Sequence, residues 1–146
     1  MHNLPRFNQL LHSIETVHIV TPAPGDPVLY TVPTNLILSI SSFTFTFIAS
    51  AAVANRFLSL SLSTASQLVY FFADPVPITA GQTFAISAFL GAQYQHPAPT
   101  TGSISWPIPF NLVLYPADTL AITVIAIDVN DQLTGLNFQA RSWITD

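Results

Sequence analysis

The sequence predicts a single all-β domain, a jelly-roll-like antiparallel β-sandwich of about eight strands with a short N-terminal helix or arm. Apolar residues alternate with Ser and Thr at period two through most of the chain, which is typical of strands with one buried face. Turn clusters rich in Pro and Asp separate the alternating segments, and 146 residues is the length of one domain. We therefore expect the helix or arm over residues 1–15 and the sandwich domain over 16–146.

The helix is predicted over residues 5–14, where apolar residues recur at spacings of three and four and a proline lies in the first turn. So short a helix is marginal alone, so it must dock either on its own sandwich or on a neighbouring subunit. Its candidate interface residues are Leu4, Phe7 and Leu11.

Strands are expected wherever alternation or a short apolar run lies between turns. Between Ile40 and Phe43 the apolar phase changes from even to odd positions, which predicts a β-bulge or a sheet corner. The cleanest alternation is Leu58, Leu60 and Leu62 with serines between them. The expected strands are 16–20, 28–32, 35–50, 58–62, 67–73, 82–90, 110–114, 120–129 and 136–144.

Residues 91–106 read as the longest irregular stretch, because Gln, Pro, Thr and Gly dominate it. It carries Tyr94 and His96 and ends at Trp106. We take these three residues as candidate interface residues.

The composition excludes several classes of function. Three arginines and no lysine cannot form a basic surface for nucleic acid, and without cysteine there is no thiolate chemistry. The four histidines have no metal-ligand spacing, and most of the few acids lie in turns, where aspartate caps its own backbone. We expect no enzyme, no metal and no cofactor. Asp128, Asn130 and Asp131 could hold calcium, but turn capping is the favoured interpretation.

Residues 36–54 are long enough to cross a membrane as a helix. Their period-two alternation predicts a strand instead, because a strand gathers the Ser and Thr side chains on one face. We expect no membrane partner, and we see no export signal near the N-terminus.

Only 7% of the residues are charged, against roughly a quarter in ordinary soluble domains. Free monomers with so little surface charge would associate with one another. We therefore infer that protein neighbours cover much of the surface. Arg56 is the only cation between Arg6 and Arg141. It either fixes a local turn by pairing with an aspartate or carbonyls, or bonds a subunit across an interface.

Several short segments spread over residues 30–144 carry a resemblance to a known family. These segments are Val32-Pro33 before the strand 36–46, Ala52 to Arg56, Pro107 to Pro109, Leu112 to Pro116, Asn130 to Gln132, and Trp143. Together they resemble a family of tailed-bacteriophage virion structural proteins of the capsid decoration or stabilising type. The resemblance implies a β-sandwich that assembles in a virion, often as a trimer on the capsid, and implies no catalytic residues.

We therefore expect a non-enzymatic virion protein, made in the host cytoplasm and located on the capsid surface. Its partners would be the major capsid protein or other virion proteins and copies of itself, with a trimer favoured. One alternative is a tail or head-fibre module that recognises a host glycan through Tyr94, His96 and Trp106. A second is a small jelly-roll protein that forms the shell itself, although it lacks a basic arm for packaging a genome.

Overall fold

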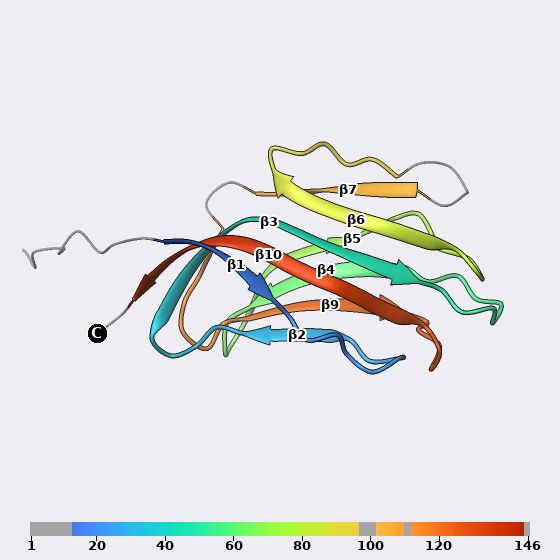
Figure 1. Ribbon diagram of the computed structural model, residues 1–146, viewed down its shortest axis with the longest axis horizontal. Helices are drawn as coiled ribbons and strands as arrows, with labels where there is room; N and C mark the ends of the chain where they lie inside the picture. The colour runs from blue at the N-terminus through green and yellow to red at the C-terminus, as the bar shows by residue number, and fades with distance from the viewer. Residues whose placement is uncertain (1–12, 97–101, 110–111, 145–146) are drawn as a thin grey trace, which may run out of the picture.

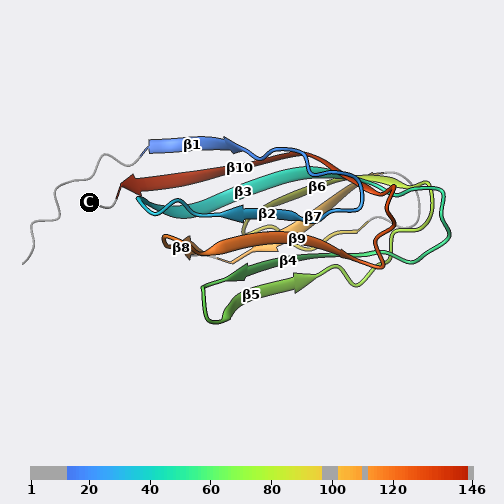
Figure 2. The ribbon, with the colours of Figure 1, turned by 90° about the horizontal axis from the view of Figure 1, so that it is seen from below.

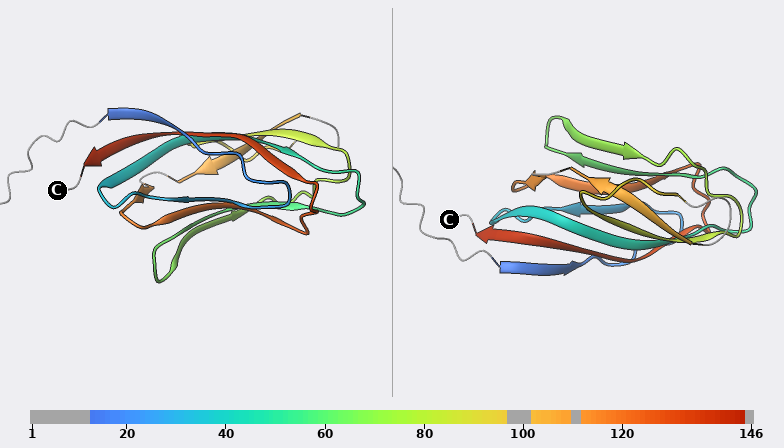
Figure 3. Two further views of the ribbon diagram at one scale, coloured as in Figure 1. Left: turned by 60° about the horizontal axis from the view of Figure 1, so that its bottom comes forward. Right: turned by 90° about the horizontal axis from the view of Figure 1, so that it is seen from above.

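The alternating segments form two β-sheets that pack face to face. The computed structural model describes residues 13–96, 102–109 and 112–144, and these contain ten strands and no helix (Figure 1). Sheet A has the order β1-β10-β3-β6-β7, with β8 also pairing with β3, and sheet B has the order β2-β9-β4-β5. Figures 2 and 3 show the sheets as two layers.

The strands of sheet A are β1 (Ser13–His18), β3 (Leu36–Ile48), β6 (Thr83–Leu90), β7 (Gly102–Ile108), β8 (Val113–Leu114) and β10 (Gln132–Ile144). Those of sheet B are β2 (Val28–Thr31), β4 (Phe57–Ser63), β5 (Leu68–Ala73) and β9 (Thr119–Ile125).

Eight of these strands have jelly-roll topology. The antiparallel pairs β4·β5, β3·β6, β2·β9 and β1·β10 nest around one another as if a long hairpin, with its tip between β4 and β5, had been rolled up. Rolling places alternate pairs in opposite sheets, which gives the two sheet orders. The predicted all-β sandwich is confirmed. Strands β7 and β8 lie in the connection between β6 and β9, and β7 runs parallel to β6.

The core fills the space between the sheets with the apolar half of each alternation. The odd-numbered phenylalanines of β3 face the even-numbered leucines of β4, and all are buried. Trp106 of β7 packs edge-on against Phe43 and Phe45.

The predicted irregularity between Ile40 and Phe43 is a β-bulge. Gln139 of β10 pairs with Ser42 and Ala140 pairs with Ile40, so Ser41 is the extra residue of β3. The Ser41 hydroxyl donates a hydrogen bond to the Gln139 carbonyl at 3.1 Å. Because the bulge absorbs one residue, Leu38 and Ile40 before it and Phe43, Phe45 and Phe47 after it all face the core.

The N-terminal prediction is wrong where it can be compared. Ser13 and Ile14 belong to β1, not to a helix, and β1 pairs with β10 along its whole length. Residues 13–15 therefore pair within sheet A. The rest of the predicted helix, with Leu4, Phe7 and Leu11, lies outside the described residues.

The stretch 91–106 is not irregular throughout, because β7 begins at Gly102. Ile104, Trp106 and Ile108 point into the core while Ser103 and Ser105 alternate with them. Pro107 fits in β7 because this strand lies at the edge of sheet A, where a missing N–H is tolerated.

Candidate interaction surface

Arg56 forms a buried ion pair at the start of β4. Its Nε donates to Asp131 Oδ2 at 2.6 Å, and both side chains are 0% exposed. Its two terminal nitrogens donate to the carbonyls of Ala52 and Ala54 and to the Ser50 hydroxyl. These bonds tie the β3–β4 loop to the β9–β10 loop, which is the local turn-fixing role that the sequence offered as one alternative.

The carboxylates of Asp131 and Asp128 also close the loop 128–131. Asp131 Oδ2 accepts the Asp128 backbone N–H at 2.8 Å, and Asp128 Oδ1 accepts the Asn130 backbone N–H at 3.0 Å. Burial alone would raise the pKa of Asp131, but hydrogen bonds from Arg56, Asp128 and Ser50 outweigh burial and lower this pKa. The pKa of Asp128 is also lowered, chiefly by the Asn130 backbone N–H. Both carboxylates thus act as turn caps.

A second buried carboxylate, Asp74, follows β5. It accepts hydrogen bonds from Tyr94 Oη at 2.7 Å, from Trp106 Nε1 at 3.0 Å and from His96 Nδ1 at 3.0 Å. The Val76 backbone N–H adds a fourth donor at 3.0 Å. Burial, and then the hydrogen bond to Asp74 and its charge, raise the pKa of Tyr94. This cluster fastens the segment after β6 to the end of β5.

Both clusters lie inside the molecule, which bears on four predicted interface residues. Arg56 and Trp106 are 0% exposed and present no atom to a partner. The side chain of His96 is 3% exposed, and Tyr94 is half-buried against Phe72. In this conformation Trp106 cannot stack on a sugar, because Phe43, Phe45 and Phe72 surround its ring.

The outward side of sheet B carries no charge. Because Leu58, Leu60 and Leu62 point into the core, the serines between them point outward, and the paired residues of β2, β5 and β9 continue their rows across the sheet. No strand of sheet B contains a charged residue. We call this surface the uncharged face. All of its residues except Ser59, which is 3% exposed, are at least partly exposed; they are Leu29, Thr31, Ser59, Ser61, Ser63, Phe71, Ala73, Thr119, Ala121, Thr123 and Ile125.

Hydroxyl ladders and apolar side chains share the uncharged face. Ser59 bonds Thr123, and Ser63 bonds Thr119, each at an oxygen–oxygen distance of 2.7 Å. Leu29, Phe71 and Ile125 are each more than half exposed. The surface is therefore apolar at its margins and weakly polar along its middle.

Strand β5 is an edge strand of sheet B, and Phe71 and Ala73 of the uncharged face belong to it. It pairs only with β4, so the backbone groups of its far side have no strand partner among the described residues. Leu68, Val69 and Phe71 are exposed on it, and it has neither the charge nor the proline that commonly protects such an edge. Figure 3 shows the β4–β5 hairpin projecting from the body of the sandwich.

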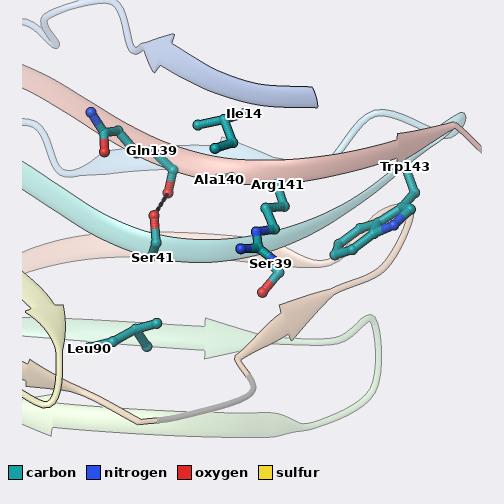
Figure 4. A pocket seen from close by; sticks show the side chains of 8 residues that line it. All are labelled: Ile14, Ser39, Ser41, Leu90, Gln139, Ala140, Arg141 and Trp143. Atoms are coloured by element: carbon teal, nitrogen blue, oxygen red, sulfur yellow. Dashed lines mark hydrogen bonds between the residues drawn. The ribbon is translucent and has the colours of Figure 1, made fainter. Parts of the chain in front are cut away.

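A surface pocket of about 410 Å³ lies on the outward side of sheet A, beside the Ser41 bulge. Arg141 and Trp143 of β10, Ser39 and Ser41 of β3, and Leu90 at the end of β6 line it (Figure 4). Nothing in the sequence analysis pointed to this pocket, because it depends on a bulge and on strands that are distant in sequence.

Within the described residues, no cluster of three or more His, Asp or Glu side chains could hold a metal ion. Nor does any helix of this part of the chain have the length and apolar character to span a membrane.

No protein-family model, no curated protein and no solved structure matches this chain. The comparisons therefore identify no family, and the function has to be argued from the surface itself.

Proposed function

We propose that this chain is a non-enzymatic structural subunit of a virion, of the capsid decoration or stabilising type, that assembles through the uncharged face of sheet B. The observation that carries the proposal is the absence of charge from every strand of that sheet, combined with large exposed apolar side chains at its margins. Exposed apolar patches of this kind mark protein–protein contacts. The virion setting comes from the resemblance in the sequence.

The unprotected edge of β5 supports self-association in particular. A second copy of β5 running antiparallel would pair its free N–H and C=O groups and would bring two uncharged faces side by side. Four of the described charged residues, Arg56, Asp74, Asp118 and Asp131, are buried and act within the fold, which supports the same assignment. Capsid protein and further copies are the partners we propose. An antiparallel β5 pair is twofold and makes a dimer, so the predicted trimer would need a different contact.

Light scattering after size exclusion tests self-association. We expect the wild-type chain to be an oligomer, and we expect Ser61→Lys and Val69→Lys to weaken association at least about tenfold, because a buried unpaired ammonium is strongly unfavourable. Thr44→Lys is the matched control: it places the same charge on an exposed hydroxyl residue of sheet A and should leave the oligomer intact.

Co-sedimentation with capsids of the virus that encodes the chain tests the virion role. Wild-type and Thr44→Lys protein should bind the shells. A wild-type chain that stays monomeric at high concentration and does not bind shells would overturn the proposal. Closed shells formed by the chain alone in electron micrographs would replace it with the shell-forming alternative, which jelly-roll topology also suits.

A further inference from the structure

The pocket on sheet A has a structural cause in the strand pairing. Strand β6 pairs with β3 only from Ser42 onward, and β8 pairs with β3 only at Leu38 and Ser39. Ser41, the extra residue of the bulge, lies between these two partners and lines the pocket, as does Leu90 at the end of β6. The pocket is therefore built into the sheet.

Its lining combines one positive charge with neutral polar groups. Arg141 is exposed, and its guanidinium makes no hydrogen bond or ion pair with any side chain or backbone group that the structure describes. Among the side chains that the structure describes, no acidic residue lines the pocket, and the other polar groups belong to Ser39, Ser41 and Gln139. Arg56 is buried, so Arg141 is the one exposed arginine of the described chain. An anion with a single charge suits such a lining, since a highly charged ligand would need more cations.

The remaining lining is apolar and includes one aromatic ring. Gln139, Arg141 and Trp143 alternate along β10, so all three point to the same side of the sheet. Figure 4 shows the indole of Trp143 beside Arg141, with Ile14 and Leu90 at the margins. A ligand of this pocket therefore needs an apolar surface for the indole and polar groups for its neighbours.

We propose that the pocket binds an acidic sugar unit, meaning a monosaccharide ring that carries a carboxylate. The planar fork of Arg141 matches a carboxylate through two parallel hydrogen bonds. A pyranose ring offers C–H faces to Trp143 and hydroxyls to Ser39 and Gln139. The volume of about 410 Å³ lies within the range of small-molecule pockets and suits one or two sugar rings. This site lies on the opposite sheet from the uncharged face.

The chain contains two tryptophans, which gives a direct test by nuclear magnetic resonance. Trp106 is buried and bonded to Asp74, whereas Trp143 lines the pocket, so the two indole N–H signals report on different places. Methyl glucuronide, added up to about 50 mM to cover millimolar affinities, should shift the Trp143 signal saturably and leave Trp106 unmoved. Methyl glucoside, which differs only by lacking the carboxylate, should bind at least about tenfold more weakly.

Variants of Arg141 separate the contribution of its charge to sugar binding from that of its planar shape. Arg141→Gln should weaken glucuronide binding at least about tenfold, and Arg141→Lys should recover only part of it, because an ammonium lacks the fork. His18→Gln, an exposed change on neighbouring β1, should bind like the wild type. Equal shifts from both sugars, unchanged binding by Arg141→Gln, or no shift of Trp143 would each overturn the proposal. The pocket lies on sheet A and the proposed self-association uses sheet B. Failure of the sugar-binding test would therefore not bear on the oligomerisation test.

Discussion

The buried carboxylates of Asp131 and Asp74 are stabilised in different ways. Asp131 faces a full positive charge, the guanidinium of Arg56, at 2.6 Å. Asp74 is surrounded by hydrogen-bond donors, among them the phenol of Tyr94 and the indole of Trp106. The difference teaches that a chain with so few cations can bury a carboxylate without an arginine, provided that enough donors point at it.

Breaking the ion pair should have the largest effect on stability. Arg56→Met leaves the Asp131 carboxylate buried without its cation, so we expect the free energy of unfolding to fall by about 3–5 kcal/mol in urea denaturation. Arg141→Met is the matched control: this arginine is exposed, and its loss should cost less than about 0.5 kcal/mol. Adding Asp131→Asn to Arg56→Met should cost less than the sum of the single changes. Equal losses for the two arginines would contradict the buried pair.

Asp74→Asn should have an intermediate effect. The amide keeps the shape of the side chain, but its NH2 group faces donors, so at least one hydrogen bond is lost at a cost of about 1–3 kcal/mol. Asp26→Asn, in an exposed turn, is the control and should leave the urea midpoint almost unchanged. If Asp74→Asn were no more harmful than its control, the donors would not be stabilising a charge.

The smallest effect concerns alkaline pH. The raised pKa of Tyr94 means that its contribution to stability is complete below the unfolded value of about 10 and is lost as pH rises above it. Tyr94→Phe should cost about 1 kcal/mol at pH 7 and make the decline in melting temperature above pH 10 shallower. Tyr115→Phe, at an exposed ring, should leave the stability at pH 7 almost unchanged. The decline that persists in Tyr94→Phe should come in part from Tyr70, whose pKa is raised by burial.

The sequence predicted the fold better than the site. The phase change after Ile40 indicated the bulge at Ser41, because period-two alternation is a local property of the backbone. Strand β7 was missed although Ile104, Trp106 and Ile108 alternate, because the surrounding prolines suggested a loop. That alternation was the signal that could have revealed it.

The surroundings of the residues that we predicted at an interface were harder to predict, because their bonding partners are distant in sequence. Arg56 and Asp131 are 75 residues apart, and Asp74 and Trp106 are 32 apart. Arg56 and Trp106 stood out because arginine and tryptophan are rare in this chain. A single sequence, however, does not show whether such a polar side chain faces the solvent or forms hydrogen bonds in the interior. In this fold the hydrogen-bonding aromatic residues and most described charges stabilise the interior, and Ser, Thr and apolar residues form the exterior of sheet B.

The position of β10 has a consequence for how the protein is made. It lies between β1 and β3 in sheet A, and the earliest strand waits for a partner more than a hundred residues further along. On the ribosome, β1 and one side of β3 therefore remain unpaired until residue 144 has emerged. Products that stop before β10 would expose two strand edges and an open core, so we expect early termination to yield insoluble chains and no partly active fragments.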